Sequence, residues 1–234
     1  MKPLPILAAA AAMLLPTAVC AQAEGTSRSW VVTQTGHPIV EGSGKYVRQA
    51  RSAAAFDEIE STGATRIEVV VGGAPGIEVE ADDNLLGHVV TKVERGRLRV
   101  YEEGSFRTSR APVVRISLGK LNGVSLKGSG DADIRGLHGG EVALASHGSG
   151  GFLVSSGSVD QVRLALSGSG RTDLSRLKAE RVNVVLSGSG TARVRAERAI
   201  EAVLSGSGEI LYGGPAREVD VITHGTGKIR RTDM

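Results

Sequence analysis

The sequence is poor in aromatic residues and has no excess of charge of one sign. Phe, Trp and Tyr together make up 3% of its 234 residues. A protein that reads nucleic acid combines a basic stripe with interleaved aromatic side chains. Here Lys and Arg alternate with Asp and Glu along the chain, and the formal net charge is only +3. The composition therefore argues against nucleic acid as a partner.

Long hydrophobic runs are also missing. The longest one, residues 4–15, has about a dozen residues, whereas a membrane-spanning helix needs roughly 20. Together with Lys2 before it and Pro16 after it, this run is typical of a secretory signal peptide. We expect a signal peptide over residues 1–21, no transmembrane segment, and export to the periplasm, the medium or the cell surface of a bacterium.

The only cysteine, Cys20, lies within this signal. Small residues permit cleavage after Ala21 or after Ala23, and either cut removes Cys20 and leaves no thiol for a disulfide or a metal. The alternative is a lipoprotein that keeps an acylated Cys20. Such signals have a small residue before the cysteine, and this one has Val19, so lipid anchoring is disfavoured.

Glycine, by contrast, is abundant, with 32 residues, and much of it is periodic. A fixed period near 20 residues is typical of a solenoid. From residue 128 on, Gly-Ser-Gly occurs five times at spacings of 20, 20, 20 and 18 residues, and Gly-Thr-Gly follows 19 residues later. The repeated glycines are Gly128, Gly130, Gly148, Gly150, Gly168, Gly170, Gly188, Gly190, Gly206, Gly208, Gly225 and Gly227.

Apolar and polar residues alternate on both sides of each triplet. Four residues before the first glycine stand Val124, Leu144, Leu164, Val184, Ala202 and Val221; the position before each of the last three is polar. Such alternation predicts short strands with one buried face. Each coil would bury that face on its neighbours, with the glycines at sharp corners that exclude side chains. We predict an all-β fold, a right-handed parallel β-helix with coils of about 20 residues.

The rest of the chain is less regular. Residues 56–100 are rich in strand patterns, and we interpret them as the first, wider coils and the N-terminal cap of the same solenoid. Residues 24–50 show no period and are expected to form a mobile leader, so that the domain covers residues 51–232. The polar tail 228–234 would act as a partial cap at the other end.

Three segments together resemble a known bacterial family of unknown function, described as "putative auto-transporter adhesin, head GIN domain". They are residues 56–60 (Phe-Asp-Glu-Ile-Glu), residues 79–86 leading to Gly96-Arg97-Leu98, and the Leu-Ser-Gly-Ser-Gly coils. The resemblance spans about residues 50–230. It implies a β-helical domain in the bacterial envelope and a role in adhesion. The chain ends shortly after its last coil, so we do not expect it to be an autotransporter by itself.

The sequence offers few candidates for catalysis or metal binding. The repeated serines lack the Gly-x-Ser-x-Gly elbow of a hydrolase. Asp131, Asp133 and Asp173 faintly resemble calcium-binding β-rolls, but other coils lack the carboxylate. His147 and His224 share a position four coils apart, roughly 19 Å at the usual strand spacing, which is too far for one metal ion. We expect no catalytic residue, no metal and no cofactor.

Three hypotheses about function remain. The first is a binding or adhesion module of the envelope, whose polar outer face presents Arg163, Asn183, Glu201 and Asp220 to an unknown protein or polysaccharide. The second is a structural solenoid that associates with itself through its end coils. The third and weakest is a carbohydrate-active enzyme, since β-helices also host such enzymes.

Overall fold

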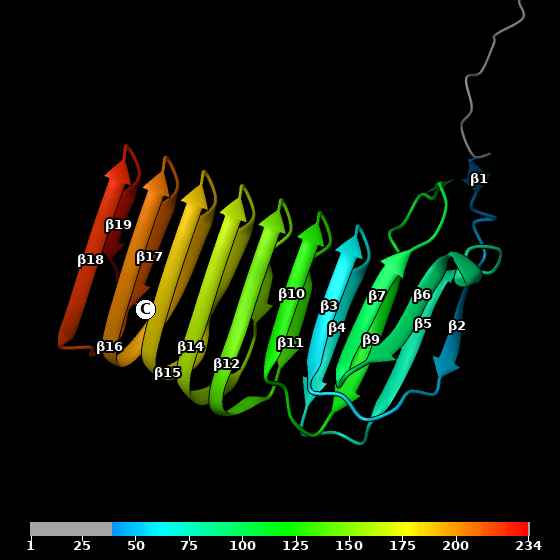
Figure 1. The fold of residues 1–234 in the computed structure, drawn as a ribbon, viewed down its shortest axis with the longest axis horizontal. Helices are drawn as coiled ribbons and strands as arrows, with labels where there is room; N and C mark the ends of the chain where they lie inside the picture. The colour runs from blue at the N-terminus through cyan, green and yellow to red at the C-terminus, as the bar shows by residue number, and fades with distance from the viewer. Residues whose placement is uncertain (1–38, 234) are drawn as a thin grey trace, which may run out of the picture. The chain divides into compact units, whose positions relative to one another are not determined.

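The computed structural model describes residues 39–233, which form a stack of coils built almost entirely of β-strands (Figure 1). The predicted all-β fold class and the parallel stacking of the coils are confirmed. In chain order the elements are β1 (Val40–Glu41), β2 (Tyr46–Arg51), β3 (Glu58–Gly63), β4 (Arg66–Val71), β5 (Gly76–Asp82), the 3-10 helix η1 (Leu86–His88), β6 (Val89–Glu94), β7 (Arg97–Glu102), β8 (Phe106–Arg107), β9 (Val113–Leu118), β10 (Gly123–Gly128), β11 (Ala132–Arg135), β12 (Leu137–Gly148), β13 (Phe152–Val154), β14 (Gly157–Gly168), β15 (Arg171–Gly188), β16 (Thr191–Gly206), β17 (Glu209–Gly213), β18 (Glu218–Gly225) and β19 (Lys228–Arg231).

Each repeat contributes a strand before its corner and a strand after it. The strands before the corners pair in parallel in the order β10, β12, β14, β15, β16 and β18, and those after the corners pair through β11, β13, β15, β16, β17 and β19. The register matches equivalent residues of successive coils, such as Val124 with Leu144 and Leu144 with Leu164. The period of the sequence is therefore the period of the structure.

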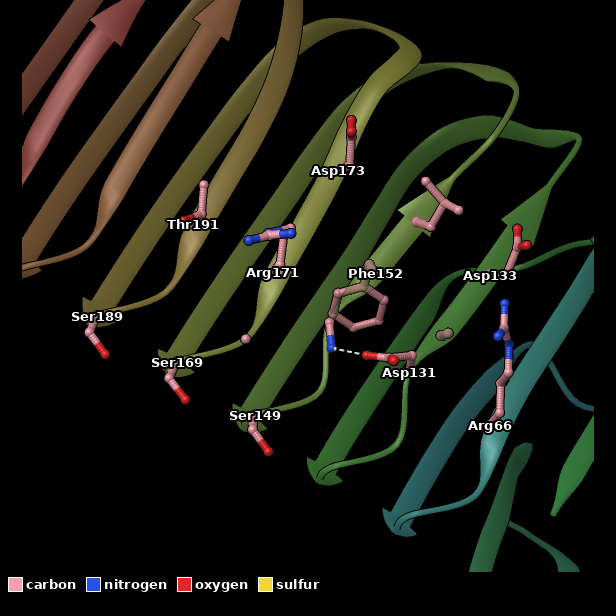
Figure 2. Close-up of a pocket in the computed structure, with 14 residues that line it drawn as sticks. Arg66, Asp131, Asp133, Ser149, Phe152, Ser169, Arg171, Asp173, Ser189 and Thr191 are labelled. Carbon is pink, nitrogen blue, oxygen red and sulfur yellow. Dashed lines mark hydrogen bonds between the residues drawn. The ribbon is translucent and has the colours of Figure 1, made fainter. Parts of the chain in front are cut away.

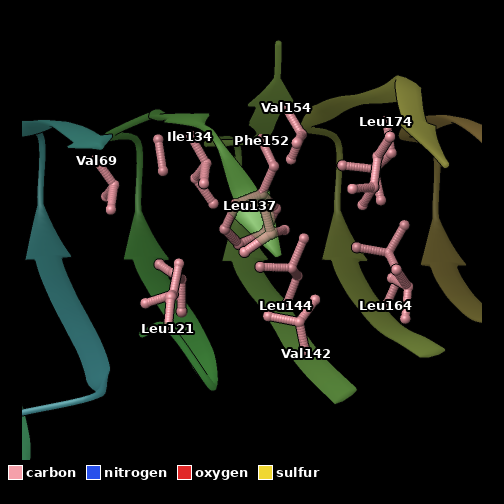
Figure 3. Close-up of a cluster of buried hydrophobic side chains, with 14 of the residues drawn as sticks. Val69, Leu121, Ile134, Leu137, Val142, Leu144, Phe152, Val154, Leu164 and Leu174 are labelled. Atoms are coloured by element: carbon pink, nitrogen blue, oxygen red, sulfur yellow. The ribbon is translucent and has the colours of Figure 1, made fainter. Parts of the chain in front are cut away.

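The core lies between the two layers of strands and runs along the stack (Figure 3). Leu144 and Leu164 from strands before the corners face Val154 and Leu174 from strands after them, and all four are at most 2% exposed. Phe152 is the largest of these buried side chains. No coil could bury its own apolar face, so the core exists only through stacking.

The N-terminal coils do not follow one another in chain order, unlike the linear stack that the sequence suggested. The β3–β4 coil pairs with β10 and β11 on one side and with β7 and β9 on the other, all in parallel. The chain thus goes outward to the β7–β9 coil and then returns across β3 and β4. Beyond that coil, β6, β5 and β2 pair antiparallel and close this end.

Part of the expected leader belongs to this closure. β2 lies within residues 46–51 and pairs along its whole length with β5, and β1 pairs with β8. These pairings join residues at least 26 positions apart, from Arg51 with Ile77 to Val40 with Phe106, so no local period in the sequence predicts them. The signal peptide, its cleavage sites, Cys20 and residues 24–38 lie outside the described residues. Within 39–233, no helix has the length and apolar character needed to cross a membrane.

At the other end, the tail expected to act as a partial cap is a strand. Residues 228–231 form β19, which continues the stack on β17, and β18 continues it on β16. The alternation of Lys228, Ile229 and Arg230 extends the pattern of earlier coils, with Ile229 in register with the buried Ile210. The last coil is therefore an ordinary coil rather than a lid.

Candidate binding groove

The glycine corners set the geometry on which the outer surface is built. The first glycine of each triplet has φ between +117° and +134°, in the region that side chains disfavour. A Cβ added to Gly168 would overlap the carbonyl oxygen of Gly148 in the neighbouring coil, and one on Gly150 would overlap that of Gly130. Between the glycines, Ser149, Ser169 and Ser189 point outward in a row (Figure 2).

The ladder of strands that follow the corners is interrupted at one place. β11 and β13 pair over three residues and β15 pairs with β16 from Arg171 onward, but β13 and β15 pair only at Leu153 and Asp173. A Cβ at Gly151 would overlap the backbone of Arg171. At this interruption the N–H of Phe152 donates to the buried hydroxyl of Thr172 at 3.3 Å.

An open groove of about 700 Å³ lies over this interruption. It runs across the corners and the starts of the strands from Arg66 on β4 to Thr191 on β16 (Figure 2). Its other lining side chains include Asp131, Leu153 and Arg171. Four strand spacings separate its ends, which corresponds to roughly 19 Å. The groove is therefore long and shallow.

The charged side chains of the groove differ in how they are engaged. Asp131 Oδ1 accepts a hydrogen bond from Gly151 N at 2.9 Å, and Asp173 Oδ1 accepts one from Ser175 N at 2.9 Å. Both oxygens of Asp133 accept a hydrogen bond, Oδ2 from the guanidinium of Arg135 and Oδ1 from the hydroxyl of Ser155. Arg171, in contrast, is exposed and makes no ion pair with any residue of 39–233. Its guanidinium is thus a cation available to a ligand.

The structure brings together only some of the aspartate and histidine residues that the sequence analysis considered as metal ligands. Asp131, Asp133 and Asp173 all line the groove, whereas His147 and His224 lie in one column on the other strand layer, separated by three serines. Within the described residues, no group of three or more His, Cys, Asp or Glu side chains is arranged to hold a metal ion. Of the three carboxylates, Asp131 is exposed, Asp173 is half-buried and Asp133 is buried.

The sequence analysis did not single out Gly151 and Arg171, although both line the groove. Two features of the sequence could have indicated them. Gly151 occupies a position held by Asp131, Arg171, Thr191 and Glu209 in other coils, and Thr172 is a polar residue in an inward column of Ala, Phe and Ile. Both signals mark a local departure from the repeat, which is where the ladder is interrupted.

A second charged cluster lies at the closed N-terminal end. Glu80 on β5 is only 6% exposed. Its carboxylate oxygens form ion pairs with guanidinium nitrogens of Arg115 at 2.5 Å, Arg48 at 3.0 Å and Arg110 at 3.1 Å. The hydrogen bond from Arg115 holds the pKa of Glu80 below its ordinary value, although burial acts in the opposite direction, and Arg48 adds to the lowering. This cluster joins β2, β5 and β9, and Arg115 also lines an open pocket of about 480 Å³ beside it.

The fold is that of a β-solenoid protein, and an open groove lies on its surface. The chain belongs to the family described as "putative auto-transporter adhesin, head GIN domain", whose match covers residues 55–216. The resemblance noted in the sequence is thereby confirmed. No curated protein matches the chain.

Solved structures share the fold. A "putative adhesin" from Bacteroides fragilis has a TM-score of 0.68 at 19% identity, covering 82% of this chain and 100% of that one. Another "putative adhesin", from Parabacteroides distasonis, has a TM-score of 0.60 at 20% identity, covering 83% and 100%. A "putative lipid binding protein" from the same species has a TM-score of 0.52 at 21% identity, covering 83% and 100%. At these identities the likeness concerns the fold.

Proposed function

We propose that this protein is an exported, non-enzymatic binding module of the bacterial cell envelope that holds a polysaccharide chain in the groove over Gly151. The observation that carries the proposal is the groove itself, where Arg171, which makes no ion pair within residues 39–233, is set among carboxylates and serine hydroxyls. The family's description as an adhesin and the signal-like first residues support the location.

The chemistry of the groove suits a chain of sugars better than a peptide. Guanidinium, carboxylate and hydroxyl groups all exchange hydrogen bonds with sugar hydroxyls. Leu153, 44% exposed, offers an apolar contact to the face of a sugar ring. A groove of roughly 19 Å could follow several sugar units along the stack. A peptide that adds to a sheet needs a free strand edge, and the strands beneath the groove are interior strands of the stack.

The arrangement of the carboxylates supports binding over hydrolysis. A glycosidase places two carboxyl groups on opposite sides of the scissile bond. Here Asp131, Asp133 and Asp173 belong to one layer of strands, so no second wall faces them across the groove. Asp131 and Asp173 each give one oxygen to a backbone N–H of their own layer.

The test is titration of the full chain with a panel of purified bacterial polysaccharides by calorimetry. We expect Arg171→Ala to weaken binding about tenfold, the value of one charge-assisted hydrogen bond. Arg193→Ala is the matched control, because Arg193 is exposed on the same layer but outside the groove, and it should leave the affinity within about twofold.

Three results would contradict the proposal. They are binding to a purified protein and to no polysaccharide, equal affinities for both variants, and the release of reducing ends from a bound polysaccharide, which would reveal an enzyme. Export is checked on protein fractionated from its native envelope. Its intact mass should begin at residue 22 or 24 without acyl chains, and an acylated Cys20 would contradict that part.

A further inference from the structure

The outer surface of the strands before the corners carries a run of apolar side chains. Three residues before the first glycine of each triplet, the side chain points outward, because in every coil but the last its two neighbours in the sequence are buried. In five successive coils this residue is apolar, and the strand register stacks the five into one column, the apolar stripe: Ala145, Ala165, Val185, Val203 and Ile222. Val185 is 47% exposed and Ile222 is 45% exposed. The stripe therefore offers an apolar surface to a partner.

A column of polar residues runs beside the stripe and changes its charge along the stack. It consists of Arg163 on β14, Asn183 on β15, Glu201 on β16 and Asp220 on β18, strands that lie side by side (Figure 1). Within residues 39–233, Nη1 of Arg163 pairs with the exposed Glu141 at 3.0 Å, and Asp220 makes no ion pair. One end of the column is thus positive and the other is negative, and both ends are accessible to a partner.

A hollow of about 410 Å³ lies next to this column, over Ala199 on β16. Ala199 is a small residue in register with Arg181 on β15 and with Glu218 on β18. Glu201 and Asp220 also line the hollow, so its sides are acidic. Arg181 stands at the rim, exposed, and makes no ion pair with any residue of 39–233. The surface therefore holds an acidic hollow and, one strand away, a cation without an acidic partner in the described part of the chain.

These charges complement one another when the surface is rotated onto itself. A two-fold axis parallel to the strands, in the plane of the contact and between β15 and β16, sets β15 of one copy against β16 of the other and β14 against β18. Arg163 then faces Asp220 of the other copy, and Arg181 faces the hollow over Ala199, beside Glu218. The symmetry makes each of these contacts occur twice. Opposite charges that meet in this way fix the register of an interface.

The apolar stripe fits the same axis. Val185 faces Val203 of the other copy, and the small Ala165 faces the larger Ile222, so the two stripes are complementary in size. The two faces could also pack about an axis along the stack. That axis would set Ala165 against Ala165, which leaves a gap, and Arg163 against a serine instead of a carboxylate. The axis parallel to the strands is therefore the better match.

We propose that two copies of this chain pack face to face through the outer surfaces of β14, β15, β16 and β18, related by this two-fold axis. The contact is four strands wide and seven residues long, roughly 19 Å by 23 Å, or about 440 Å² on each copy. A stable complex buries about 800 Å² on each partner, so this dimer is weak and reversible. The groove over Gly151 lies on the other strand layer and stays open in both copies. The dimer therefore supports multivalent binding, but it does not depend on the groove's ligand.

Sedimentation equilibrium of the full chain over a wide range of concentrations tests the dimer. We expect a reversible monomer–dimer equilibrium and no larger species. Arg163→Glu/Arg181→Glu sets acidic residues of the two copies against each other and should weaken association at least tenfold. Glu218→Arg/Asp220→Arg sets basic residues against each other and should do the same. An equimolar mixture of the two double variants should associate again, because each changed residue then meets one of opposite charge.

Arg176→Glu/Lys178→Glu is the matched control, because it makes the same charge change on exposed residues outside the contact. It should leave the equilibrium within about twofold. A separate variant, Val185→Lys, places a charge in the middle of the stripe and should abolish the dimer, while thermal unfolding shows the solenoid intact. A monomer at every concentration, a growing ladder of oligomers, or a mixture of the two charge variants that fails to associate would each overturn the proposal.

Discussion

At the scale of single residues, the corner glycines are required for two separate reasons. The first reason is the positive φ angle of the first glycine in each triplet. The second reason is close packing: at both glycines of a triplet, the backbone of the neighbouring coil occupies the space that a Cβ would need. The sequence predicted the corners from the period alone, because a residue that recurs at every coil must serve the stacking. It did not predict that Gly151, outside the triplets, is constrained in the same way.

Gly168→Ala tests this requirement. The added methyl group meets the backbone of Gly148 and the residue must keep φ near +131°, so we expect the free energy of unfolding to fall by about 3 kcal/mol. Chemical denaturation measures this change. Gly140→Ala is the control, because a Cβ there has only an ordinary contact with Asp160, and it should change stability by no more than about 0.5 kcal/mol. Equal effects of the two substitutions would contradict the packing argument.

At the scale of the elements, the regular coils and the closed end differ in how they are specified. Residues 124–231 repeat one pattern, so each strand's neighbour is the next occurrence of that pattern, and the register follows. The N-terminal strands pair across long separations, as Val124 does with Ile59, and carry no shared motif that identifies the partner. Their order therefore could not be predicted. The ion pairs of Glu80 with Arg48, Arg110 and Arg115 help to hold β2, β5 and β9 together.

Glu80→Gln tests the contribution of that cluster. The folded pKa of Glu80 lies below its unfolded value of about 4.3, so the ionised carboxylate stabilises the fold above about pH 4.3. This contribution is lost as the pH falls through the lower folded pKa. We expect the variant to be less stable by about 1–3 kcal/mol at pH 7, and the difference to disappear in strong acid.

The measurement is denaturant unfolding of both proteins at several pH values. Glu94→Gln is the control, because Glu94 is more exposed in its pairs with Lys92 and Arg99, and its substitution should change the stability much less than Glu80→Gln does at pH 7. A stability difference for Glu80→Gln that stayed constant down to pH 2 would show that the carboxylate's charge is not the cause.

At the scale of the whole molecule, the described residues combine a regular scaffold with two departures from regularity. One is the interrupted ladder at Gly151, which opens the groove, and the other is the uncovered last coil. Neither could be predicted from the repeat, because a period describes what the coils share. The groove arises where Gly151, Phe152 and Thr172 differ from their equivalents, and only the stacked backbone shows the consequence.

The groove over Gly151 is the surface that we propose binds a polysaccharide. The most direct measurement is hydrogen–deuterium exchange of the full chain with and without a bound polysaccharide. We expect protection from exchange in residues 149–153 and 169–173, and little change in residues 143–147 and 163–167, which lie in the other strand layer of the same coils. Protection of residues 143–147 and 163–167 with none at the groove would contradict it.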